Sequence, residues 1–205
     1  MNPSLAALFK EVEEFRLIKA LRLIFWRPEV FSVGELVVYP AQGVGKVERI
    51  EEQDVGGGVM TNLYIVRILT NNVTLMVPVN NACSVGLRPV SGTEQGQEIL
   101  NFLSDRSDFT GYSGQNWNRR YREYSEKLKS KEITDVAYVL KELFLISRDK
   151  ELSFGERRLL EQAMGLISME LSYALNVDQS QAKSKVEALF SDILCPAVQP
   201  EKNVE

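Results

Sequence analysis

Glycine and proline are unevenly distributed along this chain, and their distribution limits what the chain can fold into. Residues 31–92 hold eight of the 13 glycines and three of the seven prolines, whereas residues 93–195 hold no proline. Both residue types weaken or interrupt helices. Long helices are therefore disfavoured in the first stretch and allowed in the second. The distribution predicts β-structure with tight turns, followed by an all-helical region.

Short runs of apolar β-forming residues alternate with turn residues in the first stretch. Gly56–Gly58 and Asn71–Asn72 stand between such runs, and short breaks of this kind indicate hairpins. Four or five short strands in about 60 residues favour a small, strongly bent antiparallel barrel of the SH3 or Tudor kind. Because so small a unit is marginally stable alone, we expect it to lean on a neighbouring domain or a partner. The expected strands are residues 36–39, 43–50, 60–69 and 73–79.

The second stretch carries helix signals. Ser153 followed by Glu156 matches a capping box, and Asp178 is placed to cap a last helix. A further apolar face at helical spacing runs from Val136 to Phe144. Four or five helices of this kind predict a compact bundle. The helix that opens at Ser153 is expected to bury Leu159, Leu160, Ala163, Leu166, Ile167, Leu171 and Leu175.

The N-terminal residues combine apolar and charged side chains at helical spacing up to Arg27-Pro28, where a helix should stop. They predict an amphipathic helix that packs on the protein or a partner; membrane-surface association and an unordered tail are the alternatives. The charged residues among them rule out the apolar core of a secretory signal peptide. The chain has no apolar run of about 18 residues, so no membrane span is predicted.

Two distant cysteines, Cys83 and Cys195, fit a reducing compartment, so we expect a cytoplasmic protein.

These patterns together predict an α+β multidomain protein. Its expected parts are a helical extension at residues 1–30, a small SH3/Tudor-like antiparallel β-barrel at 31–92, a compact all-α helical domain at 93–195 and a tail at 196–205.

Composition argues against an enzyme. The chain has no histidine, which removes the commonest general base and the usual metal ligand. No Cys-x-x-Cys pair is present, and Cys83 is best explained as a small, partly buried apolar residue. We therefore expect no catalytic residue, no metal, no cofactor and no small-molecule substrate.

Charge favours only local contact with nucleic acid. The formal net charge is −4, so binding through bulk positive charge is excluded. Residues 115–131 nevertheless hold six basic and two acidic side chains, and Trp117 stands near their start. Asn116 could cap a helix there, arginines could contact phosphates, and the indole could stack on a base or wedge against it. The alternative is that Trp117 belongs to the core and the charges to a solvated helix face.

Several separated motifs resemble the CarD/CdnL family of bacterial transcription regulators. They are Phe31-Ser-Val-Gly-Glu-Leu-Val-Val-Tyr-Pro40, Thr74-Leu-Met-Val-Pro-Val79, Val85-Gly-Leu-Arg88, Asn116-Trp-Asn-Arg-Arg-Tyr121 and Leu152-Ser-Phe-Gly-Glu-Arg157. The resemblance covers roughly residues 31–195.

The resemblance implies a function. In this family a Tudor-like domain, shared with the transcription-repair coupling factor, docks on the β subunit of RNA polymerase holoenzyme. The helical domain meets promoter DNA at the upstream edge of the bubble, ribosomal RNA promoters included, and a tryptophan wedge helps to hold the open complex. The resemblance implies DNA contacts by Trp117, Arg119, Arg120, Arg122 and Arg157. It implies polymerase contacts by Val73, Thr74, Leu75, Met76, Val77 and Pro78.

Two positions depart from basic residues found in some relatives. Met76 replaces an arginine in the polymerase-contacting strand, and Gln53 is uncharged as well. Docking is therefore expected to depend on shape, strand-edge pairing and apolar contact more than on salt bridges. The alternative function is a protein–protein adaptor that binds polymerase or another partner without touching DNA.

Overall fold

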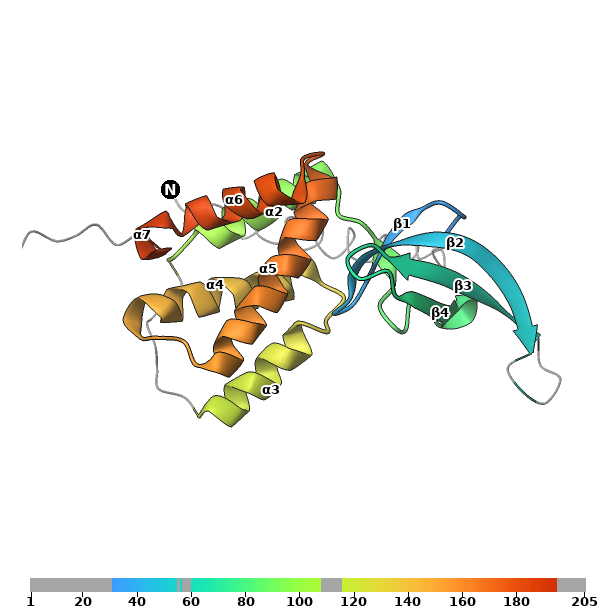
Figure 1. Cartoon of the computed structure of the whole chain (residues 1–205), viewed down its shortest axis with the longest axis horizontal. Helices are drawn as coiled ribbons and strands as arrows, with labels where there is room; N and C mark the ends of the chain where they lie inside the picture. Colours follow the sequence, from blue (N-terminus) through green and yellow to red (C-terminus); the bar gives the residue numbers. More distant parts are fainter. Residues whose placement is uncertain (1–30, 55, 57–59, 108–115, 195–205) are drawn as a thin grey trace, which may run out of the picture. The chain divides into compact units, whose positions relative to one another are not determined.

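A computed structural model of the chain describes residues 31–54, 56, 60–107 and 116–194 (Figure 1). The expected N-terminal helix at 1–30 and the tail at 196–205 lie outside the described residues. The barrel and the helices that follow belong to one compact unit from Ser32 onward.

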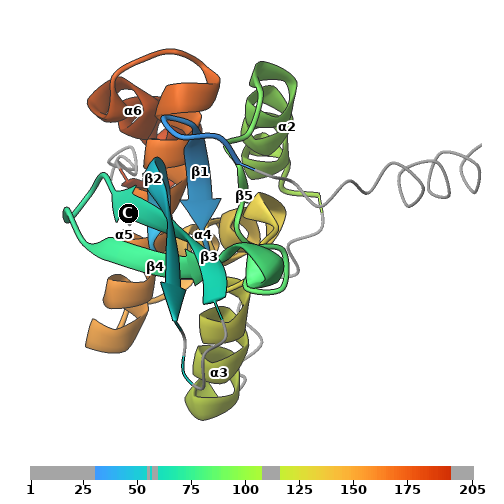
Figure 2. The same ribbon diagram turned by 90° about the vertical axis from the view of Figure 1, so that its right-hand side faces the viewer.

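Five antiparallel strands form one sheet with the order β4-β3-β2-β1-β5, and Figure 2 views the molecule from a second side. The four predicted strands are confirmed, and a short fifth pairs with β1. The second strand extends four residues beyond its predicted end, pairing Glu51 with Leu63 and Asp54 with Met60. The strands are β1 (Leu36–Tyr39), β2 (Gly43–Asp54), β3 (Met60–Ile68), β4 (Thr74–Pro78) and β5 (Arg88–Pro89), with a 3-10 turn, η1 (Val79–Asn81), after β4.

The predicted Asn-Asn turn joins β3 to β4. Asn72 has a φ of 57°, a conformation that asparagine tolerates better than most residues. The side-chain oxygen of Asn71 accepts a hydrogen bond from the Val73 N–H (3.1 Å). The Ile68 N–H donates to the Val73 carbonyl (2.8 Å), so the loop is longer than the two asparagines. The turn fixes the register in which β4 pairs with β3.

A β-bulge bends the long β2–β3 ribbon. Val47 pairs with Val66 and Arg49 with Ile65, so Glu48 is an extra residue on β2. Bulges increase strand twist and let a sheet curl. The curled sheet encloses apolar side chains that are fully shielded from solvent: Val37, Val44, Val47, Tyr64, Val66 and Ile68.

The second half is helical, as predicted. Ser153 caps the longest helix, where its hydroxyl accepts from the Glu156 N–H (3.3 Å) and Glu156 accepts from the Ser153 N–H (2.9 Å). Asp178 precedes the last long helix at its N-cap position. The helices are α2 (Thr93–Ser104), α3 (Trp117–Lys127), α4 (Ile133–Asp149), α5 (Phe154–Ala174), α6 (Gln179–Leu189) and α7 (Ser191–Leu194).

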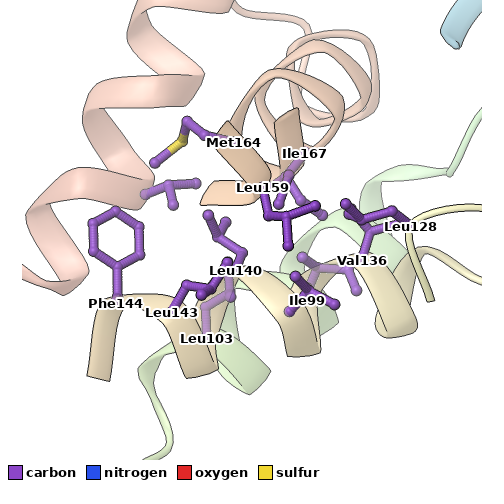
Figure 3. Close-up of a cluster of buried hydrophobic side chains, with 14 of the residues drawn as sticks. Ile99, Leu103, Leu128, Val136, Leu140, Leu143, Phe144, Leu159, Met164 and Ile167 are labelled. Carbon is purple, nitrogen blue, oxygen red and sulfur yellow. The ribbon is translucent and has the colours of Figure 1, made fainter. Parts of the chain in front are cut away.

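The helices share one apolar core, shown in Figure 3. The predicted inner face of α4 is confirmed, because Val136, Val139, Leu140, Leu143 and Phe144 are all buried. On α5 the predicted face contributes the buried Leu159, Ala163, Ile167 and Leu171, with Leu160, Leu166 and Leu175 packed at its margin.

The barrel leans on the helices, as its size predicts. Arg88 of β5 donates two hydrogen bonds to the buried carboxylate of Glu170 on α5 (2.5 and 2.8 Å) and one to the Lys131 carbonyl (2.5 Å). The hydroxyl of Ser91 donates to the same carboxylate (2.5 Å). Glu170 is buried, so these donors replace the water that its carboxylate would otherwise bind. We call Arg88, Ser91 and Glu170 the barrel–helix clamp.

Candidate nucleic-acid interface

The helix that carries the basic run begins where the sequence predicts. Asn116 is the N-cap of α3, and its side-chain oxygen accepts from the Asn118 N–H (2.9 Å). This cap satisfies one of the amide donors that a helix start leaves unpaired. Trp117 is therefore the first residue of α3 and lies at an exposed end of the helix rather than in its middle.

Trp117 packs against a glycine of another helix. Gly155 lies in the first turn of α5, and a Cβ at this position would come within 2.7 Å of Cζ2 of the indole. So close an approach requires the absence of a side chain at position 155. Trp117 is half-buried, and it borders the apolar core without entering it. The structure thus combines both sequence interpretations: one part of the indole is fixed and the rest faces solvent.

Two more aromatic side chains lie at this place. Tyr121, one turn along α3, has its ring 5.4 Å from that of Trp117, and the residue is 48 % exposed. Phe154 precedes Gly155, and at 77 % exposure it is the most exposed large hydrophobic residue in the described part of the chain. We call Trp117, Tyr121 and Phe154 the aromatic patch; α3 and α5 both begin there (Figure 1).

Arg120 lies behind this patch. It is only 6 % exposed, and its Nη2 donates to the buried carboxylate of Glu156 (2.8 Å). Its guanidinium carbon lies 5.7 Å from the centre of the Trp117 ring, within cation–π range. The sequence-based expectation grouped Arg120 with the DNA contacts, but the structure turns it toward the interior. Its guanidinium supports the ring of Trp117 instead of facing solvent.

Glu156 joins the parts that hold Trp117. Its carboxylate accepts from Lys150 Nζ (2.8 and 2.9 Å), from the Ser153 N–H and from Arg120. Burial alone would raise the pKa of this carboxyl group, but the hydrogen bonds outweigh burial and hold the pKa at about 2. Glu156 is therefore a buried anion at neutral pH. It ties the start of α3 to the start of α5.

Four exposed arginines lie on α3 and α5, the two helices that carry the aromatic patch. Arg119 and Arg122 are exposed on α3 and lie three residues apart, hence on one side of the helix. Arg157 and Arg158 are exposed in the first two turns of α5, and Arg157 pairs with the surface residue Glu151 (3.2 Å). A surface ion pair of this kind is weak and is easily exchanged for another anion. Arg119 and Arg122 share their side of α3 with Glu123 and Glu126, whereas Arg157 and Arg158 lie one turn after Gly155 on α5. The DNA-contacting role of these arginines stays a prediction.

The predicted polymerase-contacting strand is an edge of the sheet. β4 pairs with β3 only, so its other side presents backbone donors and acceptors that no strand in the described part of the chain covers. Met76 is 63 % exposed, and Val73 and Thr74 are exposed as well. Val77 is buried and points into the barrel, so its side chain serves packing. Leu75 and Pro78 are partly buried, and Gln53 is exposed near the far end of β2.

Within the described ranges, no group of three histidine, cysteine, aspartate or glutamate side chains is arranged to hold a metal ion. None of the described helices has the length and apolar character that a membrane span requires.

Both halves of the molecule match known protein families. Residues 31–91 match the CarD-like/TRCF RID domain, and residues 98–187 match the C-terminal domain of CarD. The chain belongs to the CarD/CdnL family. It is also similar to "Putative transcription factor YdeB" of Bacillus subtilis (strain 168), with 29 % identity over 156 residues that cover 76 % of this chain and 99 % of that protein.

Membership of the CarD/CdnL family confirms the resemblance seen in the sequence motifs. The chain is accordingly a transcription regulator, and its barrel is a domain of the polymerase-interacting kind.

The same motifs also contain residues whose structural place could not be predicted from the sequence. Phe154, Gly155 and Glu156 lie together in one motif, which revealed the helix cap but neither the exposure of the phenylalanine nor the contact of the glycine with Trp117.

Proposed function

We propose that this CarD/CdnL protein docks through the barrel on the β subunit of RNA polymerase and stabilises the promoter open complex. In this proposal the aromatic patch and its arginines contact DNA at the upstream edge of the bubble. The observation that carries the proposal is the half-buried Trp117, which is fixed against Gly155 at the start of two helices that bear exposed arginines.

Docking through β4 suits the chemistry of that strand. An unpaired sheet edge can accept a strand of another protein, and exposed apolar side chains beside it add contact area. Met76 and Val73 supply such side chains, and the segment from Val73 to Pro78 carries no charge. The strand therefore fits a docking mode that depends on backbone pairing and shape.

The DNA side of the proposal depends on a rigid aromatic wedge. A side chain that inserts between bases must keep its position against the force of the stack. Trp117 contacts three groups that restrict it: the backbone of Gly155, the ring of Tyr121 and the guanidinium of Arg120. Arg119, Arg122, Arg157 and Arg158 are exposed and available for phosphates. Arg120 contributes through the indole it supports.

Stabilisation of the bubble requires differential binding. A ligand shifts the closed–open equilibrium only by as much as it prefers the open state. A preference of about 1.4 kcal/mol changes the ratio of the two states tenfold. A wedge that finds its site only in melted or kinked DNA supplies such a preference without reading sequence.

The test is the lifetime of the open complex on a ribosomal RNA promoter with purified polymerase. We expect the full chain to lengthen it and Trp117→Ala to lose most of that gain while still binding polymerase. Met76→Asp should lose the gain because polymerase binding weakens. If the wild-type chain leaves the lifetime unchanged, the proposal is wrong.

The same assay separates a DNA contact from a protein adaptor. Arginine–phosphate contacts release counterions, so their contribution falls steeply with salt. Substitution of Arg119, Arg122 and Arg157 by glutamine should therefore reduce both the lifetime gain and its salt dependence. An effect that is insensitive to salt and to these substitutions would favour the adaptor.

A further inference from the structure

We propose that Phe154 is a second DNA-contacting residue, whose ring takes an unpaired nucleobase of the open promoter. This inference depends on the function proposed above and extends it. Its starting point is the position of the ring: Phe154 is the first residue of the 21-residue helix α5, next to the glycine that touches Trp117.

Folding gives no reason for a phenylalanine at this place. The residue is 77 % exposed, whereas the apolar face of α5 begins at Leu159 and points into the core. No other aromatic ring of the described residues stacks on Phe154. Large exposed apolar groups at a place where several gather indicate a binding surface. Phe154 is next in the chain to the glycine that Trp117 contacts, and Tyr121 is exposed beside Trp117.

The surroundings of the ring favour nucleic acid over protein. Arg157 and Arg158 follow within one turn of α5 and are exposed, and the surface pair of Arg157 with Glu151 is weak enough for a phosphate to replace the carboxylate. An aromatic ring beside two cations matches the surface with which proteins bind single strands: bases stack on the rings and phosphates pair with the cations. Such stacking tolerates any base, because every base has a π-face.

Trp117 and Phe154 then have different tasks. One part of the indole lies against Gly155, so the indole offers DNA only its outer part, which suits a wedge at the junction. Phe154 has no such packing and presents most of its ring to solvent, which suits a stacking platform for a base that has already left the duplex. The wedge favours opening, and the platform retains the opened base.

This division of tasks can be tested on two promoters, one fully paired and one with a mismatched, already open bubble. The variant is Phe154→Ala, with Phe154→Tyr as the stacking-competent control and Tyr173→Ala as a control for another exposed aromatic on α5. We expect Phe154→Ala to shorten the lifetime about tenfold on both promoters, about the effect of one lost base–aromatic stack. Phe154→Tyr and Tyr173→Ala should match the wild type.

A fluorescent base reports the contact directly. With 2-aminopurine placed in turn at each position of the upstream edge, the wild-type chain should quench one position, and Phe154→Ala should restore its fluorescence.

If Phe154→Ala leaves lifetime and fluorescence unchanged while Trp117→Ala abolishes the gain, this inference is wrong and the proposed function stands. A loss of polymerase binding by Phe154→Ala would assign the ring to a protein contact instead. If the wild-type chain does not lengthen the open-complex lifetime on either promoter, both the proposed function and this inference are wrong.

Discussion

At the scale of single residues, the contact between Trp117 and Gly155 is the most restrictive feature of the site. It brings an indole to the backbone of another helix at a place where a single methyl group would not fit. Packing of this closeness fixes the indole more firmly than a flexible side chain could, because its neighbour is main chain. The position of the ring is thus set before DNA is present, which lowers the entropy lost on binding.

Substitution of Gly155 by alanine should therefore displace the indole. Because the new Cβ would lie 2.7 Å from Cζ2, either the ring or the helix must move, at a cost of about 1–3 kcal/mol in the free energy of unfolding. We expect most of the open-complex gain to be lost with polymerase binding intact. In a Trp26→Phe background, the emission of Trp117 should shift to longer wavelength.

The same helix offers a matched control. Gly165 is exposed, and a Cβ there would meet no heavy atom within 4 Å. Gly165→Ala should leave activity and emission unchanged and should stabilise the helix by about 0.5–1 kcal/mol. Equal activity of the two alanine variants would show that the close contact does not position the wedge.

Residue roles were only partly predictable from sequence. The pattern found Trp117, its cap Asn116 and the exposed Arg119 and Arg122, because helix starts and charge runs are local signals. It could not distinguish Arg120 from its neighbours, since the burial of Arg120 depends on Glu156. That carboxylate belongs to another helix, and nothing near Arg120 in the sequence indicates the pair.

At the scale of elements, the starts of α3 and α5 are held together by a buried charge. Glu156 accepts hydrogen bonds from Arg120 of α3, from Lys150 before α5 and from its own cap at Ser153. Arg120 comes from a different helix, whereas Lys150 and Ser153 both lie just before α5. The carboxylate therefore aligns two helix starts that an apolar contact alone would leave free to slide.

This junction gives a defined pH dependence. The pKa of Glu156 in the folded protein is about 2, below its ordinary value of 4.5. Its contribution to the free energy of unfolding is therefore fully present above about pH 4.5 and is lost as the pH falls toward 2. The contribution is on the order of 3 kcal/mol. Urea unfolding between pH 2 and 6 should show this loss in the wild type, and Glu156→Gln should flatten it.

Glu151→Gln is the matched control, because Glu151 is exposed and pairs with Arg157 on the surface. This variant should keep the wild-type pH profile, since exposed pairs contribute little. A wild-type profile for Glu156→Gln as well would contradict the assigned role of the buried carboxylate.

Elements were more predictable than residue roles, with one instructive exception. Turn residues, capping boxes and apolar periodicity located the strands before β5 and the helices from α4 to α6. The far end of β2 was missed because Glu51 to Asp54 are polar residues with low strand propensity. These residues are part of the strand because their pairing with β3 continues to Met60. That cause is tertiary rather than local.

At the scale of the whole molecule, the clamp of Arg88, Ser91 and Glu170 connects the polymerase-interacting barrel to the helices that carry the aromatic patch. Gly86 adds a close approach, since a Cβ there would lie 3.2 Å from Cβ of Lys131. In the proposed function the barrel holds polymerase and the helices hold DNA, and force passes between the two only if the joint is stiff. The sequence motif contained Arg88, but its partner Glu170 lies far along the chain and could not be assigned from spacing.

Removal of one half of the clamp should therefore affect both stability and activity. Arg88→Met leaves the carboxylate of Glu170 buried without its bidentate partner, which costs about 3–5 kcal/mol in the free energy of unfolding. At saturating concentration, the variant should still bind polymerase but lengthen the open complex less than the wild type does. Urea unfolding and the lifetime assay measure the two effects.

Arg67→Met is the comparison, because Arg67 pairs with Glu48 on the barrel surface at 2.7 Å. Its loss should cost less than about 1 kcal/mol and leave the lifetime unchanged. If both variants lengthen the open complex as much as the wild type does, the clamp is structural only and stiffness between the two ends is not required.

The Trp117–Gly155 contact also has a consequence for how these two positions evolve. Two positions in different helices make up one device: the indole needs the bare backbone, and the bare backbone has a use only while the indole is there. A mutation at either position removes the benefit of the other, so we expect the two positions to vary together among related proteins. A lineage that gave up the wedge would be released from glycine at the start of α5, and drift at that position would record the loss.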